Sequence, residues 1–166
     1  MRPSTGVVRD LASADQLVAK VFEIAAFFKP RFLLIENPGG AGAKLPARFN
    51  LIKQRAKDLD FVGHGLEVSE LREPVTAHYC SYGYGYMKPT CFWSNVPLKL
   101  KVCAGAGKCP AMHEVTNVKS GKKAWQHKES IGCYDPSYTL VSQAQRATIP
   151  QPLMTSIIKQ AADYLY

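Results

Sequence analysis

The position that most suggests chemistry is Glu36, which directly follows the apolar run Phe32 to Ile35. This short run lies between Pro30 and the turn residues 37–40, and it predicts a strand buried on both faces, as in a parallel sheet. A carboxylate at the carboxyl end of such a strand lies where open α/β sheets bind their ligands, and it can hold or share a proton there. The alternative is an acid that only caps the turn.

A second candidate segment, residues 79–95, alternates tyrosines with glycines and then leads through Lys88 and Pro89 into an apolar stretch. Aromatic faces beside a cation suit the stacking of nucleic-acid bases and contact with phosphate. The alternative is a tyrosine-rich hairpin whose rings only pack against one another.

Cysteine and histidine gather further along the chain, in the order Cys103, Cys109, His113, His127 and Cys133. These residue types bind structural zinc, which can stabilise a segment that has no apolar core of its own. We expect Cys103, Cys109, His113 and Cys133 as the ligand set. The five residues between the first two cysteines exceed the usual two to four, so a simple glycine-rich turn between unligated thiols is the alternative.

Charge is concentrated in the same region. The chain has 21 Lys and Arg against 13 Asp and Glu, and seven lysines but one acid lie between Lys99 and Lys128. A clustered positive charge suits a polyanion such as DNA, and we expect Lys119, Lys122 and Lys123 to contact its phosphates. A solvated lysine-rich loop is the alternative.

The elements that must position these groups follow from apolar spacing. Helices are predicted over residues 13–28, 46–59 and 153–165, and antiparallel strands over residues 75–80 and 91–95. No regular pattern is visible from residue 96 to about residue 146. A chain of 166 residues suits one α/β domain, no apolar run could span a membrane, and no secretory signal is visible. The odd number of cysteines, five, in a chain with no visible export signal favours reduced thiols or metal ligands over disulfides. We expect an intracellular protein, nuclear in a eukaryote.

Taken together, two motifs resemble the C-terminal half of DNA cytosine-5 methyltransferases. These are Phe-Leu-Leu-Ile-Glu-Asn-Pro at residues 32–38 and Tyr-Gly-x4-Lys-Pro-Thr-x-Phe-Trp-Ser-Asn at residues 82–95. The similarity is greatest to a divergent branch that has Glu-Asn-Pro in place of Glu-Asn-Val. Residues 9–18 resemble the helix before the first motif, and residues 146–157 resemble the family's last motif.

The resemblance implies methyl transfer from S-adenosylmethionine to C5 of a flipped cytosine, with Glu36 as the catalytic acid that binds N3 of the base. It implies substrate contacts from Asn37, Pro38, Lys88 and Thr90. It also implies a partial Rossmann-like methyltransferase sheet. In that interpretation residues 1–95 belong to the catalytic domain, residues 96–147 form a basic target-recognition-like insert, and residues 148–166 form a helix that returns to the catalytic domain.

Two features of this family have no counterpart in the chain. The family's nucleophile lies in a Pro-Cys dipeptide, which this sequence lacks, and the glycine-rich cofactor loop belongs upstream of Glu36. We therefore expect an inactive, truncated relative, whose missing half and cofactor site a second chain could supply. The alternative is a basic nucleic-acid-binding module without catalysis, held together by zinc.

Overall fold

The computed structural model describes residues 11–39, 49–58, 71–117, 120–131 and 139–166. The chain divides into two compact units. One contains helices α1 (Leu11–Phe28) and α2 (Phe49–Asp58), and the other contains every strand together with the helices at the C-terminal end. None of the described helices is both long and apolar enough to cross a membrane.

The first unit confirms the two predicted N-terminal helices, with different ends. Helix α1 begins at Leu11, two residues before the predicted start at residue 13. The helix ends just before Lys29 and Pro30, as the proline predicts. Helices α1 and α2 contact each other. The buried face of α1 is narrower than the apolar pattern of its sequence suggests, because Phe22 is buried while Leu17 is 70% exposed.

The second unit is built on a three-stranded sheet with the order β1-β3-β2, formed by β1 (Leu34–Pro38), β2 (Val75–His78) and β3 (Pro89–Ser94). The antiparallel pairing of β2 with β3 confirms the sequence prediction. The predicted parallel arrangement of the first strand is wrong, because β1 is antiparallel to β3. That prediction depended on a continuous apolar run, but the strand begins two residues into the run and includes Glu36 and Asn37.

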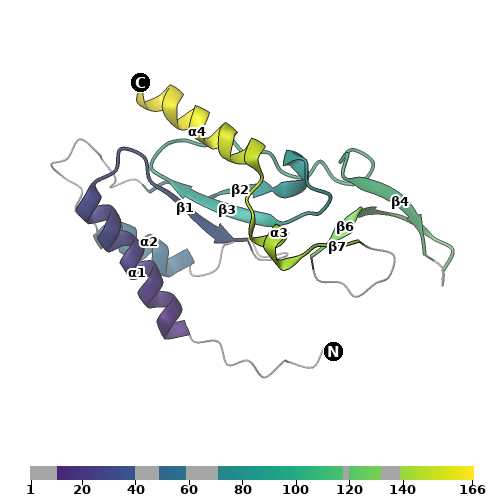
Figure 1. The fold of residues 1–166 in the computed structure, drawn as a ribbon, viewed down its shortest axis with the longest axis horizontal. Helices are drawn as coiled ribbons and strands as arrows, with labels where there is room; N and C mark the ends of the chain where they lie inside the picture. Colours follow the sequence, from purple (N-terminus) through teal and green to yellow (C-terminus); the bar gives the residue numbers. More distant parts are fainter. Residues whose placement is uncertain (1–10, 40–48, 59–70, 118–119, 132–138) are drawn as a thin grey trace. The chain divides into compact units, whose positions relative to one another are not determined.

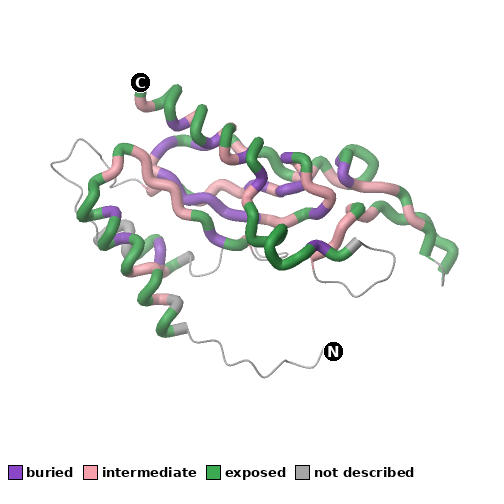
Figure 2. The backbone as a smooth tube through the Cα atoms, in the orientation of Figure 1, coloured by how far each residue is buried: buried purple, intermediate pink, exposed green. Residues whose placement is uncertain are grey.

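The structure is therefore a mixed α/β fold with small antiparallel sheets, and a Rossmann-like sheet is not confirmed. Helix α4 (Gln151–Leu165) lies along one face of the sheet (Figure 1). Its Leu153, Ile157 and Ala161 recur every four residues and join the apolar core with Phe92 of β3. Figure 2 shows the buried positions concentrated on β3 and on the inner side of α4.

Residues 96–147 contain more regular structure than their sequence suggests. Strands β4 (Met112–Thr116) and β5 (Lys123–His127) form an antiparallel hairpin, β6 (Glu129–Ser130) pairs in parallel with β7 (Thr139–Leu140), and the short helix α3 (Gln143–Ala147) follows. The amide of Glu129 donates to the carbonyl of Gly85 at 3.0 Å. A β-carbon at Gly85 would lie 2.7 Å from the Glu129 carboxyl carbon, so a larger residue there would displace the Glu129 side chain.

The packing of α4 gives a stability prediction. Replacing fully buried Ile157 with alanine leaves a cavity between α4 and the sheet, and we expect the free energy of unfolding to fall by about 2–5 kcal/mol. Its neighbour Ile158 is 58% exposed, and Ile158→Ala should change the same quantity by less than about 0.5 kcal/mol. Urea unfolding of both variants measures the difference. Equal effects would contradict the assigned helix face.

Candidate metal centre

Four metal-binding side chains converge in the second unit from separate parts of the chain. Cys80 comes from the 3-10 helix η2 (Tyr79–Tyr82), Cys103 and Cys109 come from the loop before β4, and His127 ends β5. One potential ligand atom from each residue lies within 4.8 Å of all the others. Cys80 and Cys109 are buried and the other two are partly buried, so the group is largely shielded from water.

The distances fit a tetrahedral centre. Zinc binds thiolate sulfur at about 2.3 Å and imidazole nitrogen at about 2.0–2.1 Å, which places a sulfur and a nitrogen ligand about 3.6 Å apart in a tetrahedron. The Nε2 atom of His127 lies 3.6 Å from Cys103 Sγ and 3.7 Å from Cys109 Sγ. The donor set, three sulfurs and one nitrogen, is also one that structural zinc sites use. The residues present therefore fit a zinc ion.

The loop that carries two of the thiols is shaped by glycine. Gly105 has φ +84° and Gly107 has φ +72°, both in the left-handed region that favours glycine. The amide of Cys109 donates to the Gly105 carbonyl at 2.9 Å, and this closes the turn. The amide of Gly105 lies 3.4 Å from Cys103 Sγ and donates to it, a contact that stabilises sulfur as a thiolate.

Backbone contacts fix the segment with Cys103 beside the end of β2. The Cys103 amide donates to His78 Nδ1 at 3.0 Å, and the His78 amide donates to the Lys101 carbonyl at 3.1 Å. The Lys101 amide donates to the Tyr82 hydroxyl at 2.7 Å. These contacts bring Cys103 to the same place as Cys80, which lies between His78 and Tyr82 in the chain.

Burial changes the protonation of two members of the group, Cys80 and His127. Burial raises the pKa of Cys80 to about 12, and the neighbouring Cys103 and Cys109 add to this effect. Burial, with a smaller contribution from the charge of His78, lowers the pKa of His127 and keeps its imidazole neutral and able to ligate. Without a metal, the Cys80 thiol resists ionisation. A divalent cation removes that penalty because it binds the thiolate forms.

The structure brings together part of the ligand set expected from the sequence. Cys103 and Cys109 lie in the group, whereas His113 pairs in register with Gln126 and therefore faces away from His127. Cys133 lies outside the described residues. Cys80 was missed because it falls in the tyrosine-rich segment, which suggested stacking chemistry.

The five residues expected to contact a cytosine differ in how far they are exposed. Glu36 and Pro38 are exposed on β1, and Asn37 is buried between them. Thr90, opposite Pro38 on β3, is fully buried. Lys88 donates to the carbonyl of Arg146 at 2.9 Å, and its ammonium lies 4.9 Å from the centre of the Tyr79 ring. Lys88 therefore holds the end of α3, and Thr90 is a core residue.

Two of the three lysines expected to contact phosphates, Lys122 and Lys123, lie at the outer end of the β4–β5 hairpin. Lys122 is exposed, and Lys123 is exposed and forms an ion pair with Glu114 at 3.0 Å. Lys119 lies outside the described residues.

Comparison of the chain with models of protein families, with curated proteins and with solved structures gave no match.

The metal centre yields a prediction that separates its cysteines from the others. Cys80→Ser removes one sulfur ligand, and we expect the affinity for Zn²⁺ to fall by more than about 100-fold. Loss of a residue that only supports a metal ligand lowers the affinity by about 10- to 100-fold, and loss of the ligand itself should cost more. Competition with a chromophoric chelator measures this affinity. Cys91→Ser is the matched control, because Cys91 is equally buried but lies on β3 outside the group. The same affinity in both variants would contradict the assignment.

Proposed function

We propose that the chain is a zinc-stabilised module that binds nucleic acid through a lysine-rich hairpin. The observation that carries this proposal is the convergence of Cys80, Cys103, Cys109 and His127 at the base of that hairpin. The four donors come from three sites in the chain, so a single ion would connect the hairpin to the sheet.

The donor set favours a structural metal over a catalytic one. Catalytic zinc sites use three protein ligands and keep a fourth position for water or substrate, whereas structural sites are closed by four protein ligands. Here four protein donors already complete a tetrahedron. The chemistry that zinc would supply is cross-linking: it would hold the loop at Cys103 and the strand end at His127 against η2.

The segment so anchored is strongly basic. Its described residues include six exposed lysines: Lys99, Lys101, Lys108, Lys122, Lys123 and Lys128. The acid Glu114 already forms an ion pair with Lys123, and exposed pairs of this kind contribute at most about 1 kcal/mol, which leaves Lys123 able to exchange partners. Of these lysines, Lys122 and Lys123 lie on the hairpin and Lys128 directly follows it, whereas the other three precede β4. Together they give residues 99–128 a positive potential that attracts phosphates.

Salt dependence tests the role of the hairpin. We expect binding of mixed-sequence duplex DNA to weaken steeply with salt, with a slope of about −0.9 for each phosphate neutralised. The double variant Lys122→Ala with Lys123→Ala should reduce the magnitude of that slope by up to about two. Fluorescence anisotropy across a salt series gives the slopes.

The control for this experiment is Lys159→Ala, which removes an exposed lysine from α4 instead. It should leave the slope nearly unchanged. If the Lys159 variant lowers the slope as much as the hairpin variant does, or if the wild-type affinity is independent of salt, the proposal is wrong.

A second candidate function is the handling of a flipped cytosine, as in the methyltransferases that the sequence resembles. The observation that favours it is the position of Glu36, exposed on β1. Burial raises the pKa of Tyr79, and the negative charge of Glu36 adds to that effect, so a charged carboxylate lies close to a buried phenol.

Duplexes with one mispaired cytosine test this second function, because a mispaired base flips at lower cost. Glu36→Gln should weaken binding to the mispaired duplex several-fold and leave binding to the matched duplex unchanged. The chain alone should transfer no labelled methyl group from S-adenosylmethionine to cytosine, because its sequence has no Pro-Cys nucleophile. Measurable transfer, or an equal effect on both duplexes, would contradict this role.

A further inference from the structure

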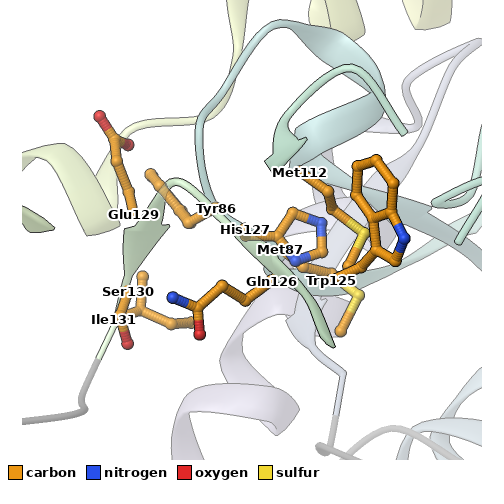
Figure 3. A pocket seen from close by; sticks show the side chains of 9 residues that line it. All are labelled: Tyr86, Met87, Met112, Trp125, Gln126, His127, Glu129, Ser130 and Ile131. Atoms are coloured by element: carbon orange, nitrogen blue, oxygen red, sulfur yellow. The ribbon is translucent and has the colours of Figure 1, made fainter. Parts of the chain in front are cut away.

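A pocket of about 320 Å³ lies beside the metal centre and shares His127 with it. Figure 3 shows its lining: Tyr86 and Met87 from the loop before β3, Met112 from β4, and Trp125, Gln126 and His127 from β5. This volume is at the lower end of the range for small-ligand sites, which suits a planar group of one or two rings.

Trp125 is the prominent aromatic side chain of this pocket. Its side chain is 44% exposed although it is one of the largest apolar groups in the chain, whereas Trp93, the other tryptophan, is 1% exposed. A β-carbon at Gly107 would lie 3.7 Å from the indole, so one part of the ring packs over the loop between Cys103 and Cys109. The metal loop therefore supports Trp125 and leaves the rest of the ring available to a ligand.

Polar and polarisable side chains line the same pocket as the Trp125 ring. Gln126 extends its amide toward Ser130 and Ile131 (Figure 3), and this amide supplies both a donor and an acceptor. Met87, 38% exposed, also lines the pocket, and its thioether suits contact with an aromatic ring. A planar ligand with hydrogen-bonding edges fits this combination better than an aliphatic chain does.

The positive charge near the pocket indicates that the planar group is attached to an anion. The lysines nearest in sequence to Trp125 and Gln126 are Lys122, Lys123 and Lys128, and all three are exposed. A ring stacked on Trp125 would thus lie on a hairpin that attracts phosphates. Nucleic acid combines planar bases with phosphates, but in a duplex the faces of the bases are covered by their neighbours. The ligand must therefore expose its bases.

We infer that this pocket binds an unpaired base of a single-stranded nucleic acid, stacked on Trp125, while the hairpin lysines contact the adjoining phosphates. This inference rests on the proposed nucleic-acid binding and specifies the form of the ligand. Any base can stack, so the site tolerates sequence variation, and the Gln126 amide can add a modest preference.

The two tryptophans allow a direct test on the zinc-loaded chain. Titration with oligo(dT) or oligo(U) should quench the emission of exposed Trp125, whereas buried Trp93 supplies a constant background. Trp125→Ala should weaken binding of either oligonucleotide about 5- to 150-fold, and Trp125→Phe should recover much of this loss. The stronger of the two binders shows whether DNA or RNA fits better. Tyr164→Ala, which removes an exposed ring from α4, is the matched control and should change nothing.

Failure of this inference is distinguishable from failure of the proposed function. Binding that depends on salt and on Lys122 and Lys123 but is unchanged in Trp125→Ala would overturn the base-stacking site and leave the basic hairpin in place. Tighter binding of a duplex than of its separate strands, with no change in emission, would do the same. Absence of binding to every oligonucleotide would overturn both.

Discussion

The placement of the β4–β5 hairpin depends, in this account, on one electrostatic constraint, the crowding of three thiols and an imidazole in a partly buried space. Cys80, Cys103, Cys109 and His127 each offer a ligand atom within 4.8 Å of the rest. Burial, with a smaller contribution from the neighbouring sulfurs, raises the pKa of Cys80 to about 12, so this thiol stays protonated at neutral pH without a bound cation. A cation that binds thiolates converts this unfavourable cluster into a cross-link, and its binding free energy becomes part of the folding free energy.

The location of that cross-link explains how a segment with little apolar character keeps a defined place. The β4–β5 hairpin contributes few residues to the main core, which α4 and the three-stranded sheet share. A separate small cluster, Cys80 with Cys109 and Ala111, packs around the ligands instead. The hairpin is also tied to its own loop, since the Lys128 amide donates to the Ala111 carbonyl at 3.0 Å. A bound metal would join the four ligand residues and the hairpin into one structural element, which presents the exposed lysines and Trp125.

The sequence predicts those parts of the fold in which local periodicity and burial agree. Helix α4 follows its spacing of Leu153, Ile157 and Ala161, and the β2–β3 pair follows two apolar runs separated by a glycine-rich loop. The direction of β1 could not be predicted, because strand pairing is a long-range property that an apolar run does not encode. The buried face of α1 was also not predicted correctly, because the helix carries more apolar residues than it buries.

The candidate site shows the same limit. Cys103 and Cys109 are close in sequence and their spacing indicates a shared role, whereas Cys80 lies 23 residues before Cys103 and joins them only through the packing of η2. His127 and His113 are equivalent in type. Only the register of the hairpin, in which Met112 pairs with His127 and His113 with Gln126, decides which one faces the thiols. Residue type thus indicated a metal site, and the register of the hairpin determined which histidine lies beside the thiols.

X-ray absorption spectroscopy at the zinc edge of the purified, zinc-loaded chain tests the central claim most directly. The account predicts one zinc per chain with three sulfur neighbours at about 2.3 Å and one nitrogen neighbour at about 2.0–2.1 Å. In Cys80→Ser one sulfur neighbour should be lost, and in Cys91→Ser the spectrum should be unchanged. A chain that retains no zinc after removal of excess metal, or a first coordination shell of nitrogen and oxygen alone, would contradict it.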